Sequence, residues 1–308
     1  MPGWTRFLRR LKTQAYPWQG SRIPRSRRRT TIVVTVFNAC EDTSRCLESV
    51  KSAGVDAARR VLVIDDCSTD PRIGMLLNAY DSAPGFHVLR NSENIGYTRS
   101  INIGVRWSGD DDVVLLNSDT LVTTGWLDGL RHTAFSEDRI GTVTPMSDNA
   151  GAFSFPRMGV PNPKAAHVGH EEWVHGITAA TMNCAAVEVP TGSGFCMFIK
   201  RELFAEIGLF DQEAFPRGYG EENDFCLRAI ANGWRNVITP RAYVFHARNA
   251  SFGSERNDLL DAGMAVLRVR YPDYLPMVGE AFRSQPMLAL REASARAVQG
   301  MEARTSLR

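Results

Sequence analysis

Four short apolar runs alternate with helical segments in the first part of the chain, and this alternation constrains the fold most. The runs cover residues 31–37, 61–64, 86–89 and 113–116. Helical patterns follow the first three runs and end near residues 52, 80 and 107. The first run is rich in β-branched residues on both faces, which is typical of a buried parallel strand. The pattern predicts an α/β fold with a Rossmann-like, doubly wound and mostly parallel sheet and flanking helices.

Polar residues stand where two of these predicted strands end. Residues 117–119 follow the fourth run directly, and Asp65 and Asp66 end the second. Ligands bind at the carboxyl ends of strands in such sheets, so both segments are candidate binding residues. Two adjacent carboxylates repel each other unless a ligand, a cation or solvent compensates their charge. The turn that follows, 68–70, fits helix capping at least as well as ligand binding.

The second part of the chain has less regular patterns. Residues 150–189 are rich in glycine, proline, asparagine and histidine, and we expect an irregular insert that is functional or mobile. Its His167, His170, Trp173 and His175 are candidates to line an acceptor groove or to form a lid. Regular structure is expected again as a strand at 194–199, helices from 202 and across 221–232, a strand at 241–245, and a mainly helical tail over 259–308 interrupted at Pro272, Pro276 and Pro286.

The formal net charge is only +2, but the basic residues are unevenly distributed. A basic cluster precedes the first strand and contains Arg6, Arg9, Arg10, Lys12, Arg22, Arg25, Arg27, Arg28 and Arg29. Apolar residues at helical spacing lie between the first of these cations, at Trp4, Phe7, Leu8 and Leu11. This arm is either a short helix on an anionic membrane surface or a solvated tail. No nucleic-acid partner is expected, because no nucleic-acid-binding motif accompanies the cations.

Two further features bear on location. No apolar run approaches the roughly 18 residues that span a bilayer, and the start of the chain lacks the pattern of a secretory signal. We therefore expect a cytoplasmic protein, either free or peripheral on the inner face of the membrane. The cysteines are scattered without Cys-x-x-Cys pairs, so we expect reduced thiols and neither a zinc site nor a disulfide framework.

A series of short polar segments runs from the first strand to residue 246. The segments are 36–38, 65–70, 93–97, 117–119, 191–194, 221–228 and His246. In this order they resemble family-two glycosyltransferases of the GT-A fold, in particular the rhamnosyltransferase-like members that build bacterial surface polysaccharides. The expected organisation is a basic arm at 1–29, a GT-A domain at 30–250 with a nucleotide-binding half at 30–120 and an acceptor half at 121–250, and a C-terminal helical extension at 251–308.

The resemblance implies a nucleoside-diphosphate sugar as donor. The implied donor-binding residues are Val36, Asn38, Asp65, Asp66, Asn94, Gly96, Asn117, Ser118 and Gly192. Gly96 would let the backbone approach the ligand closely, just before a helix N-terminus that favours a diphosphate. Asp66 fits the ring N–H of uracil or thymine, which favours UDP or dTDP over GDP.

A divalent cation, Mg²⁺ or Mn²⁺, is also implied, because the charge of the departing diphosphate must be neutralised. The implied metal ligands are Asp119 and His246. The family motif is commonly Asp-x-Asp, and here Asn117 replaces the first carboxylate. This lowers the negative charge of the site, so cation binding is expected to rely on the donor's phosphates. A nitrogen ligand makes Mn²⁺ at least as acceptable as Mg²⁺.

Acidic residues at 221–224 match the Glu-Asp-x-Asp segment of the family. Glu222 stands where the family has an aspartate, and we expect it to remove the proton of the acceptor hydroxyl. Asp224 is the second candidate for the base, and Glu221 is expected to position the acceptor or its neighbours. Acidic residues are also favoured at a helix N-terminus for purely structural reasons.

The expected function is inverting, metal-dependent transfer of a hexosyl or deoxyhexosyl group to a glycan or lipid-linked acceptor in surface polysaccharide synthesis. Two alternatives remain open. A nucleotidyltransferase shares the sheet architecture and a metal site, but the chain lacks a Gly-rich basic loop after the first strand. A non-catalytic glycan-binding or scaffold protein on the same fold would tolerate the departures at Asn117 and Glu222.

Overall fold

The first half of the chain forms the alternating strands and helices that its sequence predicts. The structure, a computed structural model, describes residues 28–55, 59–164, 168–247 and 255–306. The elements of this half are β1 (Thr30–Val36), α1 (Cys40–Ser52), β2 (Arg59–Asp65), α2 (Pro71–Asp81), β3 (Phe86–Arg90), α3 (Tyr97–Trp107) and β4 (Asp112–Asn117). The start of α2 has a clear cause, because the Asp70 side chain accepts a hydrogen bond from the N–H of Arg72 at 2.9 Å and Pro71 follows it.

The second half contains more regular structure than the sequence predicts. Its elements are β5 (Thr120–Leu121), α4 (Trp126–Ser136), β6 (Ile140–Met146), the 3₁₀ turn η4 (Gly151–Phe153), α5 (His170–Thr181), β7 (Val187–Val189), β8 (Cys196–Ile199), α6 (Arg201–Ile207), α7 (Glu221–Ala231), β9 (Arg235–Tyr243) and β10 (Phe245–His246). The expectation of an irregular insert at 150–189 is wrong at α5. That helix buries Trp173 and Ile177 beneath the C-terminal part of the chain, and this spacing of one turn was the missed signal.

The C-terminal extension is helical, as predicted, and consists of α8 (Glu255–Arg270), α9 (Tyr274–Arg283) and α10 (Gln285–Ser306). Pro272 lies between α8 and α9. Pro276 and Pro286 fall within the first turns of α9 and α10, where the missing N–H has no helical partner to lose. These two prolines therefore accompany helix starts and do not interrupt helices.

One mixed sheet runs through the domain. Its eight strands have the order β3-β2-β1-β4-β8-β6-β9-β7. β1 pairs in parallel with β2 and β4, β2 with β3, and β6 with β9. β8 lies antiparallel between β4 and β6, and β7 is antiparallel to β9. A separate two-stranded ribbon pairs β5 with β10 and brings residues near 120 beside residues near 246.

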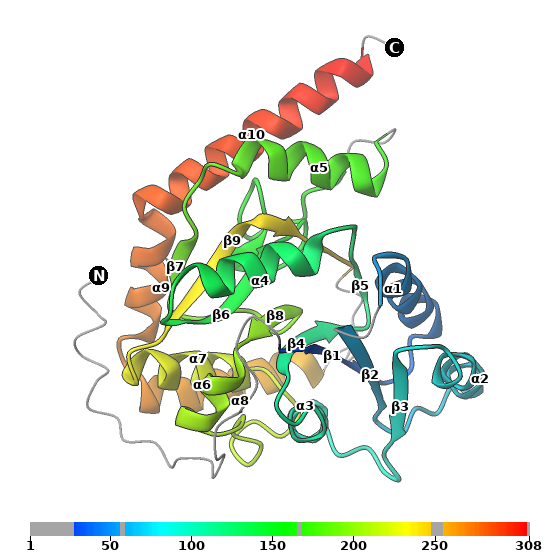
Figure 1. The fold of residues 1–308 in the computed structure, drawn as a ribbon. Helices are drawn as coiled ribbons and strands as arrows, with labels where there is room; N and C mark the ends of the chain where they lie inside the picture. The colour runs from blue at the N-terminus through cyan, green and yellow to red at the C-terminus, as the bar shows by residue number, and fades with distance from the viewer. Residues whose placement is uncertain (1–27, 56–58, 165–167, 248–254, 307–308) are drawn as a thin grey trace.

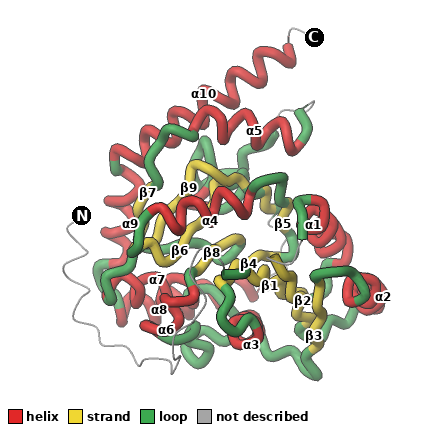
Figure 2. Tube along the Cα trace, in the orientation of Figure 1, coloured by secondary structure: helices red, strands yellow, loops and turns green. Residues whose placement is uncertain are grey.

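Helices cover both faces of the sheet (Figures 1 and 2). α1, α2 and α4 pack on one face, in a core that extends to α5 and α10, and α3, α6 and α7 pack on the other. A smaller apolar cluster joins α7 to α8 and α9. The C-terminal extension is thus packed against the helix that carries the acidic segment. Within the described residues, no helix is long and apolar enough to cross a membrane.

A buried charged network lies at the amino ends of β1 and β4, opposite the strand ends of the candidate site. Oδ1 of Asp112 accepts a hydrogen bond from the N–H of Arg201 at 3.1 Å, and Oδ2 lies 3.6 Å from Nη1 of Arg131. Burial raises the pKa of Asp112 to about 6. Arg28 pairs with Glu202 at 2.8 Å, so the last residues of the expected arm belong to the folded body. The remainder of the arm, 1–27, lies outside the described residues.

Candidate active site

Asp66 joins three strand-end loops. Its N–H donates to the carbonyl of Val36 at 2.8 Å. Its carboxylate accepts hydrogen bonds from the side chain of Asn91 at 2.7 Å and from the N–H groups of Ile95 and Gly96 at 3.0 and 2.9 Å. The anion at the entrance of α3 is therefore a carboxylate of the chain itself, where we expected the diphosphate of a ligand.

Gly96 serves the packing of its own chain. The residue has φ of +89°, and a Cβ at this position would overlap the carbonyl oxygen of Pro216. The close backbone approach that we attributed to a ligand is made by the loop that leads to α7. Gly192 is similar, since a Cβ there would lie 2.7 Å from the sulfur of Met197 and 2.9 Å from Oγ1 of Thr144.

Asn38 and Asp65 hold the turn before α2. The side-chain oxygen of Asn38 accepts from the N–H groups of Thr69 and Asp70, both at 2.9 Å. Oδ1 of Asp65 accepts from the N–H of Ser68 at 2.9 Å. Asn38 and Asp65 thus lie next to Val36, at the carboxyl ends of β1 and β2. Asn94, in contrast, is exposed on the loop before α3.

Asp119 and His246 meet through the ribbon. Nε2 of His246 lies 3.2 Å from Oδ1 of Asp119. Strand pairing produces this contact, because His246 is opposite Thr120 and the N–H of Ala247 donates to the carbonyl of Asp119 at 2.9 Å. The imidazole stacks on the ring of Phe195, with centroids 5.1 Å apart and planes at 14°. Phe195 was not among the residues predicted from the sequence, and its carbonyl also accepts a hydrogen bond from the N–H of Asn117 at 2.9 Å.

The chemistry of this pair suits a divalent cation that is shared with a ligand. A carboxylate oxygen and an imidazole nitrogen are both ligands for Mn²⁺ and Mg²⁺. No group of three or more His, Cys, Asp or Glu side chains that could hold a metal occurs among the described residues. Within the part of the chain that the structure describes, Asp119 and His246 are the two candidate ligands at this position, and a cation there would take its other ligands from a bound molecule or from water.

The first turn of α7 brings two glutamates to the same region. Glu221 is buried, with 3% of its surface exposed, and accepts a hydrogen bond from the N–H of Gly220 at 3.0 Å. Burial, followed by the charge of Glu222, raises the pKa of Glu221 well above its ordinary value. Oε2 of Glu222 is buried and has no hydrogen-bond partner within the described part of the chain. Glu222 is thus available for a ligand.

Asp224 is directed into a different environment. Its side chain is 1% exposed, and Oδ2 accepts from Nε of Arg228 at 2.7 Å. Oδ1 accepts from Nη1 of Arg270 at 2.9 Å and from the hydroxyl of Tyr271 at 2.8 Å. Both oxygens are engaged in a structural network, which leaves Asp224 poorly suited to be the base.

Tyr97 is a site residue whose role the sequence did not suggest. Its hydroxyl lies 3.5 Å from the carbonyl oxygen of Gly194. A Cβ built at Gly194 would be 3.3 Å from that hydroxyl and 3.8 Å from Oε1 of Glu222. Burial and the charges of both glutamates raise the pKa of Tyr97, so its hydroxyl stays protonated. An aromatic residue directly after Gly96 at the start of a helix was the available signal.

Consecutive residues connect the two parts of the site. Gly194 borders Glu222, and Phe195 borders His246. The loop before β8 therefore contacts both the glutamates and the cation ligands. The candidate base and the candidate cation ligands lie on either side of it, at the carboxyl end of the sheet.

The expected acceptor residues of the insert are only partly supported. Trp173 is fully buried in the core and cannot line a groove. His170 packs edge-on against Phe245, with ring centroids 4.7 Å apart, so it lies next to the ribbon. His175 is exposed on α5, and His167 lies outside the described residues.

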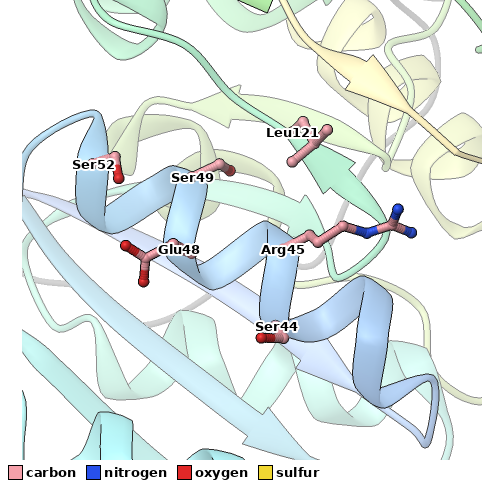
Figure 3. A pocket seen from close by; sticks show the side chains of 6 residues that line it. All are labelled: Ser44, Arg45, Glu48, Ser49, Ser52 and Leu121. Atoms are coloured by element: carbon pink, nitrogen blue, oxygen red, sulfur yellow. The ribbon is translucent and has the colours of Figure 1, made fainter.

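A shallow hollow of about 400 Å³ lies beside α1, next to Leu121 of β5 (Figure 3). It is lined by Ser44, Arg45, Glu48, Ser49, Ser52 and Leu121. None of the candidate site residues belongs to this lining, so the hollow has no part in the chemistry considered below.

Two solved glycosyltransferase structures are similar to this fold. The crystal structure of GalNAc-T7 with UDP, GalNAc and Mn²⁺ superimposes with a TM-score of 0.59 and 16% identity, over 87% of this chain and 54% of that one. This chain spans about half the length of that protein. The mannosyltransferase PcManGT from Pyrobaculum calidifontis, in complex with GDP-Man and Mn²⁺, superimposes with a TM-score of 0.57 and 18% identity, over 97% of this chain and 81% of that one. The predicted GT-A fold is thereby confirmed.

The sequence of the chain agrees with this class. The profile of the family described as Glycosyl transferase family 2 matches residues 31–208, and the chain belongs to that family. An N-acetylglucosaminyl-diphospho-decaprenol L-rhamnosyltransferase of Mycobacterium tuberculosis is 24% identical over 244 residues, which are 73% of this chain and 78% of the relative. A pre-mycofactocin glycosyltransferase of the same organism is 26% identical over 259 residues, which are 80% of this chain and 49% of the relative. The chain is a glycosyltransferase that uses a nucleotide-sugar donor, and its rhamnosyltransferase-like character is confirmed.

Proposed function

We propose that the protein is an inverting, cation-dependent glycosyltransferase that moves a sugar from a nucleoside diphosphate to a glycan or lipid-linked acceptor in surface polysaccharide synthesis. The observation that carries the proposal is the loop at Gly194 and Phe195, which borders Glu222 on one side and His246 on the other. In this arrangement one site would contain a carboxylate for the acceptor hydroxyl and a ligand pair for the cation that neutralises the diphosphate.

Asp119 and His246 would hold Mg²⁺ or Mn²⁺ together with the donor's phosphates. Such a cation, when bound, neutralises the charge of the leaving diphosphate. Asn117 contributes no negative charge, so the two-ligand site is expected to bind the cation weakly until the donor supplies more oxygens. Mn²⁺ in the complexes of both structural neighbours supports this assignment.

Glu222 is the proposed base. Its carboxylate would take the proton of the acceptor hydroxyl as that oxygen attacks the anomeric carbon on the side opposite to the diphosphate. Glu222 has a buried oxygen without a partner, whereas Asp224 has both oxygens engaged. This difference favours Glu222 over Asp224 as the base.

For the donor we propose UDP or dTDP as the nucleotide. A carboxylate has about four acceptor positions, and Asp66 uses three of them within the chain. One position remains for the ring N–H of uracil or thymine. Val36 and Asn38 lie at the same strand ends, as a nucleoside site there would require.

For the acceptor we propose a glycan or a lipid-linked sugar. The mycobacterial relative is named for a decaprenol-linked diphosphosugar acceptor, which supports a lipid-linked one. Such an acceptor would place the protein in the cytoplasm and at the inner face of the membrane, with the basic arm as its contact. Deleting residues 1–27 and following binding to anionic vesicles tests this part.

The central experiment combines donor binding with turnover. Native protein is titrated calorimetrically with UDP-, dTDP- and GDP-sugars with and without Mn²⁺, and release of nucleoside diphosphate is followed. We expect cation-dependent binding, a loss of about 10³-fold in turnover for Asp119→Asn, and donor binding without transfer for Glu222→Gln. Asp128→Asn, an exposed carboxylate on α4, is the matched control. Donor binding that ignores the cation would reject the metal assignment, and an absence of donor binding would favour a scaffold.

A further inference from the structure

Glu221 and Glu222 form an unusual pair, because neighbouring residues at a helix start normally point in different directions. Here both carboxyl groups border the same aromatic side chain. A Cβ built at Gly218 would lie 3.6 Å from Cδ1 of Tyr97 and 3.7 Å from Oε2 of Glu221. The corresponding atom at Gly194 would lie close to the Tyr97 hydroxyl and to Oε1 of Glu222. The ring of Tyr97 therefore borders both acids, and two glycines leave the space for it.

Two carboxylates in such a place cannot both be ionised at little cost. Like charges at short range in a buried site raise the pKa of one member, which then keeps its proton. Burial and the neighbouring charge of Glu222 raise the pKa of Glu221, and a side-chain hydrogen bond between the two groups acts in the same direction. Glu221 is also the deeper of the two, since it is buried and Glu222 is partly exposed.

We propose that Glu221 stays protonated at neutral pH and donates a hydrogen bond to Glu222, which makes it a positioning residue for the base. This inference rests on the proposed role of Glu222. Oε2 of Glu222 is buried and accepts no hydrogen bond within the described residues. A proton on Glu221 gives the pair a donor, and one of the two oxygens of Glu222 then stays available for the acceptor hydroxyl. Glu221 in turn is oriented by the N–H of Gly220, which donates to Oε2 at 3.0 Å.

The two acids have separate tasks in this arrangement. The acceptor O–H bond breaks, and its proton goes to Glu222. The acceptor oxygen forms a bond to the anomeric carbon, while the bond from that carbon to the diphosphate oxygen breaks and its electron pair leaves with the diphosphate. The proton of Glu221 does not move to the substrate; it fixes the direction in which Glu222 presents its free oxygen.

Three other titratable groups of the described residues interact with the pair. They are Tyr97 on α3, Tyr274 on α9 and Cys226 on α7. Burial raises the pKa of each, so all three are neutral at neutral pH. Arg217, in the loop before α7, is the nearest cation along the chain.

A comparison of two substitutions tests the inference. In Glu221→Gln the amide N–H can still donate to Glu222 and the amide oxygen can still accept from Gly220. We expect this variant to keep kcat within a few-fold of the native enzyme. Glu221→Ala removes the donor, and misplacement of the base is expected to lower kcat on the order of 10²-fold with the donor KM unchanged. Equal losses in the two variants would overturn the inference, since a required negative charge is missing from both.

Two further measurements distinguish a failure of this inference from a failure of the proposed role of Glu222. Infrared difference spectra between native protein and Glu221→Gln at neutral pH are expected to show the carbonyl band of a protonated carboxyl in the native protein only. Absence of that band would also overturn the inference. Glu222→Gln tests the base itself: if that variant transfers sugar at the native rate, the proposed function of Glu222 fails whatever Glu221 does. Cation-dependent donor binding reports that each variant is folded.

Discussion

The hydroxyl of Tyr271 donates a hydrogen bond to Oδ1 of Asp224 at 2.8 Å and ties the first turn of α7 to the end of α8. A second contact acts nearby, because a Cβ at Gly263 would overlap the carbonyl oxygen of Tyr219. Tyr219 has a φ of 65° and immediately precedes Gly220 and the two glutamates. The C-terminal extension thus supports the turn from which the candidate base emerges.

Asp224→Asn is expected to destabilise the protein by about 3 kcal/mol, because it leaves Arg228 and the neighbouring donors without a buried charge partner. Chemical denaturation measures the loss. Asp211→Asn is the matched control: Asp211 also pairs with Arg270, at 2.9 Å, but its side chain is 30% exposed, and we expect less than about 1 kcal/mol. Equal effects would show that the α7–α8 contact is no stronger than a surface pair.

Gly96→Ala is expected to cost at least about 3 kcal/mol and to lower transfer activity. The new methyl group must displace the Pro216 carbonyl, in addition to the strain of φ at +89°. Gly109→Ala provides the comparison, because φ is +61° and the space around it is open. That variant should lose only about 1–2 kcal/mol. Thermal unfolding and donor turnover of both variants decide whether the close approach or the dihedral angle dominates.

His246→Gln is expected to lower the ratio of Mn²⁺-supported to Mg²⁺-supported activity. The substitution replaces a nitrogen ligand by an oxygen, which suits the harder cation better. Transfer rates are measured at saturating concentrations of each cation. His132→Gln, on α4 and outside the candidate site, serves as control. An unchanged ratio in His246→Gln would mean that this imidazole does not contact the cation.

Asp112→Asn is expected to flatten the dependence of stability on pH between about 4 and 6. The pKa of Asp112 is raised to about 6 from 3.8, so the folded state holds the proton more tightly than the unfolded state. The stability that this provides is complete below about pH 4 and is lost as pH rises through about 6. At pH 7 the variant should therefore be more stable by up to about 3 kcal/mol. Melting temperatures of both proteins across this range test the sign, and parallel curves would contradict it.

The fold of residues 30–120, the expected nucleotide-binding half, could be predicted from the sequence because its signals are local. Apolar runs of four to seven residues, helix caps such as Asp70, and polar residues directly after strands each depend on neighbours in the chain. The start of α1 is different, since that helix begins at Cys40 after Ala39 in a left-handed conformation. No side chain caps it, so no sequence signal marks its start.

The partners of the site residues could not be predicted, because they come from distant parts of the chain. Asp66 is satisfied by the loop before α3, Gly96 faces Pro216, and Asp224 binds residues of α8. The sequence indicates which side chains can accept a hydrogen bond, but tertiary packing decides which donor reaches them. The antiparallel insertion of β8 between β4 and β6 has the same cause, since its pairing is fixed by long-range register.

The ribbon of β5 and β10 has a consequence for how binding and folding are linked. It joins Asp119, at the end of the first half of the domain, to His246, near the end of the second half, with β6, β8 and β9 formed in between. Such a contact has high sequence separation and exists only when the intervening strands are in place. A ligand that binds Asp119 and His246 at once therefore stabilises the folded state in which both halves of the domain are in place. Donor and cation together would stabilise the complete domain, and protease resistance of regions far from the site should rise when both are bound.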